Sequence, residues 1–150
     1  MKSFRHAWDG IVYAVKTERN MRIHLAAAFY AFLLGRIFGF GRSELALAAL
    51  ACGLVIGAEL INTALERLCD GLEPGHSPVV KLVKDLAAGA VLVCAAAAAG
   101  LFAVLLWRAD GWRLPRHDLL YTGVAALPFW CAFIVWFGRK KGVNPNERHD

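Results

Sequence analysis

Long uncharged apolar runs constrain the fold of this chain more than any other feature of its sequence. Four such runs cover residues 25–35, 45–58, 86–107 and 119–138. A helix needs about 20 apolar residues to cross the hydrocarbon core of a bilayer. The third and fourth runs reach that length alone, and the second continues past Glu59 in helical register. The first run reaches it only with residues 21–24 and 36–40, whose basic side chains can extend to the interface.

The composition is that of a membrane protein. Hydrophobic residues make up 58% of the 150-residue chain, which is high for a water-soluble domain. We therefore predict an all-α integral membrane fold with four transmembrane helices. Residues 3–20, which come before the first apolar run, carry apolar side chains at helical spacing, including Phe4 and Trp8. This pattern predicts an amphipathic helix that lies on the membrane surface.

Basic residues flank the apolar runs at both ends of the chain. Such residues favour the cytoplasmic side, so we predict a cell-membrane protein with both termini cytoplasmic, which agrees with an even number of spans. The linker over residues 67–85 would then be cytoplasmic too. The basic residues border apolar spans and form no patch interleaved with aromatic residues, so no nucleic-acid partner is expected. They are Lys2, Arg5, Lys16, Arg19 and Arg22, followed at the far end by Arg139, Lys140 and Lys141.

A row of polar side chains follows the second apolar run. Glu59, Asn62, Glu66 and Asp70 are spaced so that all four fall within about 80° of one helix face. The helix predicted over residues 44–70 would be roughly 40 Å long, so its last turns must leave the ~30 Å hydrocarbon core. Carboxylates along a membrane helix are costly and usually face a cation, a cavity or a polar partner. Their natural use is to hold a hard divalent cation and to move a proton.

Three motifs carry a resemblance to a known family. Residues 17–24 read TERNMRIH, residues 58–66 read AELINTALE, and residues 84–91 read KDLAAGAV. In this order and spacing they resemble the undecaprenol kinase and prokaryotic diacylglycerol kinase family of small bacterial membrane lipid kinases. The first motif is more similar to the undecaprenol branch.

The resemblance implies a homotrimer with an amphipathic N-terminal helix and three spans in each subunit. It covers Phe4 to about Trp107, so residues 1–113 are predicted to form the lipid kinase domain. Residues 114–150 are predicted to add a fourth transmembrane helix and a basic tail, which departs from the family pattern.

The resemblance also implies roles for individual residues. Glu59 would be the catalytic base, and Glu18 and Glu66 would ligate Mg²⁺, with ATP as the phosphoryl donor. The nucleotide would be bound by His6, Glu18, Glu66, Asp70, His76, Ser77, Lys84 and Asp85. The lipid substrate would be bound by Trp8, Asn20, Arg22, Glu59 and Asn62.

Elementary chemistry is compatible with these roles. The chain has neither a GxxxxGK[ST] loop nor the motifs of protein kinases, so any ATP chemistry must come from the carboxylate face, Glu18 and the Lys84–Asp85 pair. Mg²⁺ usually takes one or two carboxylates together with phosphate oxygens. Lys84 can pair with a phosphate as a point charge, and Asn62 can orient the reacting groups.

The sequence therefore predicts an enzyme that phosphorylates a membrane lipid alcohol, with undecaprenol as the first choice and diacylglycerol as the second. Two other classes stay open. A non-catalytic membrane scaffold should tolerate the loss of Glu59. A small cation-coupled transporter should show paired broken helices; the visible breaks are near Gly39 and at Pro128.

Overall fold

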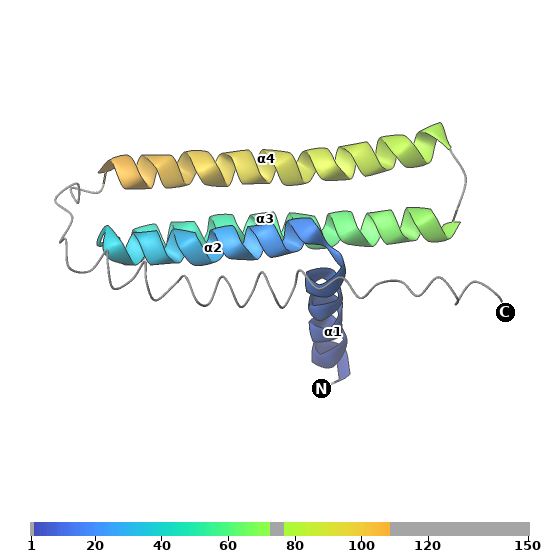
Figure 1. Ribbon diagram of the computed structural model, residues 1–150, viewed down its shortest axis with the longest axis horizontal. Helices are drawn as coiled ribbons and strands as arrows, with labels where there is room; N and C mark the ends of the chain where they lie inside the picture. Colours follow the sequence, from blue (N-terminus) through green and yellow to red (C-terminus); the bar gives the residue numbers. More distant parts are fainter. Residues whose placement is uncertain (1, 73–76, 109–150) are drawn as a thin grey trace. The chain divides into compact units, whose positions relative to one another are not determined.

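The computed structural model describes residues 2–72 and 77–108, and all the regular secondary structure in this part of the chain is α-helix. Its elements are α1 (Lys2–Thr17), α2 (Arg19–Ile37), α3 (Arg42–Leu72) and α4 (Pro78–Arg108), with no strand among the described residues (Figure 1). The predicted all-α class is thus confirmed. The predicted fourth span over residues 119–138 and the predicted domain boundary after residue 113 lie outside the described residues.

The first helix ends earlier than the sequence suggested. The apolar pattern predicted one helix over residues 3–20, but α1 stops at Thr17. Glu18 follows with an extended backbone, at φ −98° and ψ 124°, and α2 begins directly at Arg19. The break at a single residue redirects the chain, and Figure 1 shows α1 leaving the line of α2 at a steep angle.

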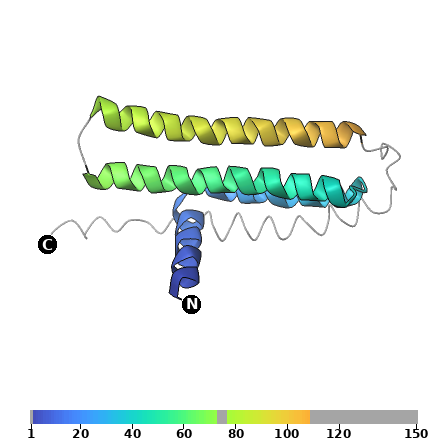
Figure 2. The same cartoon turned by 180° about the vertical axis from the view of Figure 1, so that it is seen from behind.

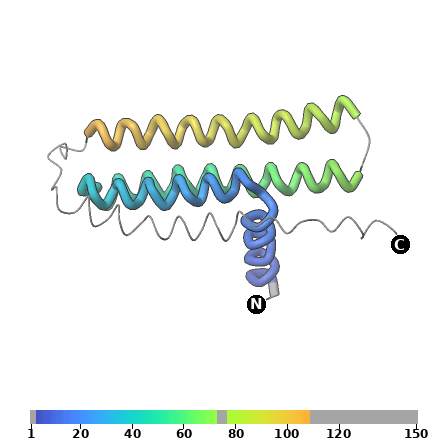
Figure 3. The backbone as a smooth tube through the Cα atoms, in the orientation of Figure 1, coloured from blue at the N-terminus to red at the C-terminus, as the bar shows by residue number. Residues whose placement is uncertain are grey.

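Helix α3 is the centre of the helical packing. Its most extensive pairing is with α4, and it packs against α2 as well, as the two opposite views show (Figures 1 and 2). The tube in Figure 3 shows that α2 lies beside only the N-terminal part of α3. The C-terminal part of α3 extends beyond α2 and lies alongside α4. The point where α1 gives way to α2 therefore lies near the middle of α3.

Helices α3 and α4 are long and apolar enough to cross a membrane, and they are the only two of the described helices that are. Their most apolar stretches are not core helices of a soluble fold, because only 17% and 11% of those stretches are buried within the chain. Large apolar side chains such as Leu50 and Leu92 are more than half exposed. This outward apolar surface is what lipid or another membrane helix would cover.

The packed helices leave an apolar cavity on the N-terminal side of Glu59. It measures about 350 Å³ and is lined by small side chains of α3 and α4, such as Ala48, Cys52 and Ala98, with His24 on the α2 side. The alanine-rich stretch of α4 permits a close approach between the helices.

A tight turn joins α2 to α3. Gly39 has a φ of +69°, a left-handed conformation that glycine adopts at no steric cost. Gly35 lies against Phe40, where an added Cβ would come within 2.9 Å of the ring atom Cδ2. Phe40 in turn packs on Phe102 of α4, with the ring centroids 5.8 Å apart. Gly35 therefore lets the turn fold back against both neighbouring helices.

We expect Gly35→Leu to lower the thermal stability of the purified protein by about 1–3 kcal/mol, because the larger side chain must displace the Phe40 ring from its packed position. Circular dichroism in detergent measures the transition. Gly71→Leu is the matched control, since a Cβ at Gly71 meets nothing within 4 Å. Equal stability of the two variants would show that the Gly35 contact is unimportant.

Candidate functional site

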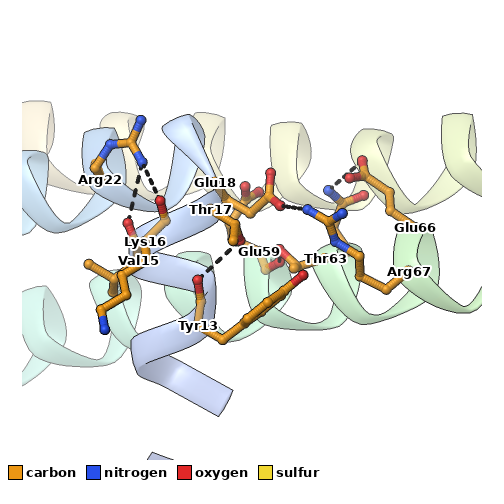
Figure 4. Close-up of polar contacts among 11 residues, drawn as sticks. Tyr13, Val15, Lys16, Thr17, Glu18, Arg22, Glu59, Thr63, Glu66 and Arg67 are labelled. Carbon is orange, nitrogen blue, oxygen red and sulfur yellow. Dashed lines mark hydrogen bonds and ion pairs between the residues drawn. The ribbon is translucent and has the colours of Figure 1, made fainter. Parts of the chain in front are cut away.

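The junction between α1 and α2 brings Glu18 to the middle of α3. The carboxylate of Glu18 is 20% exposed, and its Oε1 accepts a hydrogen bond from the Arg67 guanidinium at 2.7 Å. The two residues are 49 positions apart in the sequence, so the ion pair ties the junction to α3 (Figure 4). Glu18 uses no side-chain hydrogen bond to cap α2, which leaves its carboxylate for contacts with α3.

Two polar side chains of α3 are buried close to this junction. Glu59 is 2% exposed and Asn62 is 5% exposed. Within the described part of the chain, Glu59 Oε2 and Asn62 Oδ1 are buried and have no hydrogen-bond partner. Buried polar atoms in native proteins are nearly always satisfied, because an unmade hydrogen bond costs about 1–3 kcal/mol. Both oxygens can accept a hydrogen bond or contact a cation, and the carboxylate oxygen of Glu59 can also take up a proton.

Glu66 completes the acidic cluster, which we define as Glu18, Glu59 and Glu66. Asn62 Nδ2 donates to Glu66 Oε1 at 3.1 Å, so the amide orients this carboxylate. The negative charges of Glu66 and Glu18 both act on Glu59. Figure 4 shows the side chains of Glu18 and Glu59 close together, with Glu66 further along α3. Glu59 is thus repelled by both other carboxylates of the cluster, and a cation bound nearby would relieve that repulsion.

The local helix at Glu59 is fixed by its neighbour Thr63. The Thr63 hydroxyl, which is also buried, donates to the backbone carbonyl of Glu59 at 2.9 Å. The hydroxyl is satisfied inside its own helix, so it adds no unpaired group to the cluster. Among the described residues, the buried polar atoms of this face without a partner are therefore Glu59 Oε2 and Asn62 Oδ1.

Only three of the four residues predicted to share a polar face of α3 lie close together in the structure. Glu59, Asn62 and Glu66 are close to one another, but Asp70 is 59% exposed and forms an ion pair with Lys84 of α4. Asp85 is exposed next to Lys84. These residues form a second charged group at the end of α3 and the start of α4.

Arg22, predicted to bind the lipid substrate, contacts the end of α1. Its guanidinium NH1 donates to the carbonyls of Val15 and Lys16, each at 3.3 Å. These carbonyls belong to the last turn of α1, where a cation satisfies unpaired acceptors and interacts favourably with the helix dipole. Arg22 thus stabilises the junction that presents Glu18.

The remaining predicted site residues are more dispersed. His6 and Trp8 are exposed on α1, and Asn20 is exposed in the first turn of α2. Ser77 is half-buried, and its carbonyl accepts the backbone N–H of Lys81 at 3.1 Å in the first turn of α4. His76 lies outside the described residues.

Sequence reasoning missed Arg67 and Tyr13. The Arg67 guanidinium lies 5.6 Å from the centroid of the Tyr13 ring, on which it is stacked as a cation, while it also bonds Glu18. A basic residue directly after Glu66 was the available signal, but nothing local indicates that it reaches back to α1.

The carboxylates suit a hard cation that also binds phosphate. Within residues 2–72 and 77–108, no group of three or more His, Cys, Asp or Glu side chains converges as a complete metal site. Glu18 and Glu66 offer two carboxylates, which is the number Mg²⁺ usually takes from protein when phosphate oxygens supply the rest. The donor set therefore fits Mg²⁺ bound together with a nucleotide.

The comparison with known proteins gives the family. Residues 5–106 match the profile of a family described as prokaryotic diacylglycerol kinase. This chain belongs to that family. The match includes the whole acidic cluster and both charged residues of the Asp70–Lys84 pair, and the family resemblance predicted from the three motifs is confirmed.

Two curated relatives are similar to this member of the prokaryotic diacylglycerol kinase family. A diacylglycerol kinase of Synechocystis is 43% identical over 98 residues, which are 64% of this chain and 55% of the relative. An undecaprenol kinase of Bacillus subtilis is 40% identical over 94 residues, which are 63% of this chain and 76% of the relative. The chain thus matches little more than half the length of the Synechocystis protein. No solved structure matches the chain.

Proposed function

We propose that this chain is an ATP-dependent lipid kinase that phosphorylates the hydroxyl of a membrane lipid alcohol. Undecaprenol is the first choice of substrate, because the motif at residues 17–24 is more similar to the undecaprenol branch of the family. Diacylglycerol is the alternative, and the two similar relatives bear these two names. The observation that carries the proposal is the buried carboxylate of Glu59, whose Oε2 has no hydrogen-bond partner within the described residues. It lies on a helix that is long enough to cross a membrane.

Glu59 would act as the general base. The hydroxyl of the lipid would donate its hydrogen bond to Glu59 Oε2, which satisfies the unpaired oxygen. In the transfer step the proton passes to that carboxylate, and a bond forms between the lipid oxygen and the γ-phosphorus of ATP. The bond from that phosphorus to the bridging oxygen breaks, and ADP leaves. Because Glu59 is buried, water competes poorly for the same oxygen.

Glu18 and Glu66 would hold Mg²⁺, each through carboxylate oxygens. When bound, the cation neutralises charge on the transferring phosphates. Asn62 would keep Glu66 oriented through the hydrogen bond between its amide and Glu66 Oε1.

The nucleotide would extend toward the charged group at the start of α4. Lys84 is paired with Asp70, and both side chains are partly exposed, at 33% and 59%. A phosphate could replace the Asp70 carboxylate as the partner of the ammonium group. Ser77 and Asp85 lie close by in the sequence, and His6 and His76 complete the proposed nucleotide contacts. Trp8, Asn20 and Arg22 are proposed to contact the lipid from the α1–α2 side.

The exposed apolar faces of α3 and α4 support a membrane-embedded protein, and we propose the homotrimer that the family resemblance implies. Isolated in water, this surface would aggregate, whereas lipid and neighbouring subunits would cover it. We propose that α1 lies at the membrane surface, because Phe4 and Trp8 are 80% and 59% exposed. The active site would face the cytoplasm.

The substrate is decided by a competition assay. Purified protein in mixed micelles is supplied with MgATP and equal amounts of undecaprenol, diacylglycerol and a simple long-chain alcohol, and mass spectrometry identifies the phosphorylated product. Undecaprenyl phosphate as the dominant product supports the first choice, and phosphatidic acid supports the alternative. Ion flux through sealed vesicles without any lipid phosphate would instead favour a transporter.

If residues 119–138 cross the membrane, both chain termini lie on the cytoplasmic side. We expect a single cysteine introduced at Asn146, in a variant without the native cysteines, to resist labelling from outside intact cells. It should react once the membrane is permeabilised. Reaction in intact cells would mean three spans or the reverse orientation.

A further inference from the structure

The acidic cluster depends on a junction that few apolar contacts hold in place. Glu18 is the single non-helical residue between α1 and α2. Most of α1 is exposed, including Phe4 and Trp8, and Ala14 near its C-terminal end is its one buried residue among those described. Apolar burial therefore fixes α1 only weakly, and polar contacts near Glu18 have to set the position of the junction.

Arg67 makes two such contacts at once. Its guanidinium donates to Glu18 Oε1 at 2.7 Å, and it lies 5.6 Å from the centre of the Tyr13 ring (Figure 4). One contact reaches the junction residue and the other reaches the last turns of α1. A planar guanidinium can bond a carboxylate and stack on a ring at the same time, which a lysine ammonium cannot do as well.

The place of Arg67 on α3 gives these contacts a consequence for the cluster. Arg67 directly follows Glu66, whose carboxylate is turned to Asn62 within the same helix. Arg67 thus anchors Glu18 to the same turn of α3 that carries Glu66. The negative charges of Glu18 and Glu59 act on each other, so without this anchor the Glu18 carboxylate would be repelled by that of Glu59.

We propose that Arg67 is a positioning residue, which holds Glu18 opposite Glu59 and Glu66 so that the cation site is assembled before Mg²⁺ and nucleotide bind. This inference rests on the proposed function, because it takes Glu18 and Glu66 as the cation ligands. Tyr13 contributes by holding the guanidinium plane. If Arg67 instead competed with the cation for Glu18, loss of Arg67 would tighten cation binding, whereas the proposed role predicts weaker binding.

The role concerns position and not overall stability. The side chain of Arg67 is 51% exposed, and ion pairs at such sites contribute little to folding. Loss of Arg67 should therefore leave the thermal unfolding transition nearly unchanged. A partner that orients a metal ligand typically accounts for about 10- to 100-fold in metal affinity.

The test compares Arg67→Ala and Arg67→Lys with the wild-type protein. Arg36→Ala is the matched control, because Arg36 is an exposed arginine of α2 outside the proposed site. Two quantities are measured: the Mg²⁺ concentration for half-maximal lipid phosphorylation, and the affinity for Mn²⁺ by electron paramagnetic resonance with a non-hydrolysable ATP analogue. We expect Arg67→Ala to shift both by about 10- to 100-fold toward weaker binding, with Arg67→Lys in between and Arg36→Ala unchanged.

A double variant shows whether Arg67 acts through Glu18. We expect Arg67→Ala combined with Glu18→Ala to bind Mn²⁺ no more weakly than Glu18→Ala alone. Unchanged or tighter Mn²⁺ binding in Arg67→Ala overturns the inference, and so does an absence of Mn²⁺ binding by the wild-type protein. If the wild-type protein binds Mn²⁺ but phosphorylates no lipid, the proposed function fails while the Mn²⁺ comparison still decides the role of Arg67.

Discussion

Glu59→Gln should lower kcat for lipid phosphorylation by about 10²–10⁴-fold, the usual contribution of a positioned general base. The amide has nearly the same size as the carboxylate but cannot take up the hydroxyl proton. Glu59 is 2% exposed, so water cannot easily replace it as the proton acceptor. ATP affinity and thermal stability should change little. Turnover, ATP binding and the unfolding transition are all measured on one purified preparation.

The matched control for this prediction is Glu44→Gln. It makes the same change on the same helix, at a residue whose side chain caps the N-terminus of α3 by accepting the backbone N–H of Gly41. Glutamine can still accept that hydrogen bond, so turnover should be retained. Near wild-type turnover in Glu59→Gln would remove Glu59 as the base. A loss confined to ATP affinity would place Glu59 in the nucleotide site and move the search for a base to Asp85.

Glu18→Ala and Glu66→Ala should each raise the Mg²⁺ requirement steeply. Each variant removes a proposed ligand, so the effect should exceed the roughly 10- to 100-fold change that the loss of an outer partner produces. Nucleotide binding should weaken in parallel, because Mg²⁺ and phosphate would share the site. Mg²⁺ titrations of activity, together with binding of a fluorescent ATP analogue, measure both effects.

The Glu18 and Glu66 variants should differ from Glu59→Gln in how their activity responds to Mg²⁺. Glu59→Gln lowers turnover at saturating Mg²⁺, whereas excess Mg²⁺ should partly restore the Glu18 and Glu66 variants. Glu44→Gln again serves as the control on α3, because it removes a carboxylate but keeps the hydrogen bond to Gly41, and size-exclusion chromatography checks that the oligomer stays intact. An unchanged Mg²⁺ dependence in both variants would rule out the metal assignment.

The long helices could be predicted from the sequence because their signals are local. The predicted helix over residues 44–70 lies within two residues of the observed ends of α3, and the apolar run over residues 86–107 lies inside α4. The same spacing argument correctly grouped Glu59, Asn62 and Glu66 on one face, where the Asn62–Glu66 hydrogen bond is found.

The exposure of Asp70 at the end of that face could not be predicted from the sequence. Helical spacing gives the direction of a side chain but not which other elements surround it. Asp70 points along nearly the same direction as Glu59, yet one is 59% exposed in its side chain and the other is buried. Helix α2 lies beside only the N-terminal part of α3 (Figure 3), whereas Asp70 is two residues from the C-terminal end of α3 at Leu72. Lys84 of α4 pairs with Asp70 there instead.

The break at Glu18 was also beyond local reasoning. The apolar residues of the predicted helix over residues 3–20 end at Val15, so their spacing does not locate the break, and no glycine or proline marks it. The contacts that stabilise the break come from elsewhere: Arg67 lies 49 residues away, and Arg22 reaches back to the carbonyls of Val15 and Lys16. Long-range pairing of this kind leaves no periodic signal in the sequence.

We propose above all that Glu59 of this chain activates a lipid hydroxyl for transfer of the γ-phosphoryl group of ATP. The most direct measurement incubates the purified wild-type protein and Glu59→Gln with γ-³²P-labelled ATP, Mg²⁺ and undecaprenol in mixed micelles, and follows label in the lipid fraction. We expect labelled lipid with the wild-type protein and about 10²–10⁴-fold slower labelling with Glu59→Gln. Equal labelling by the two proteins, or none by the wild-type protein with undecaprenol or diacylglycerol, would contradict this proposal.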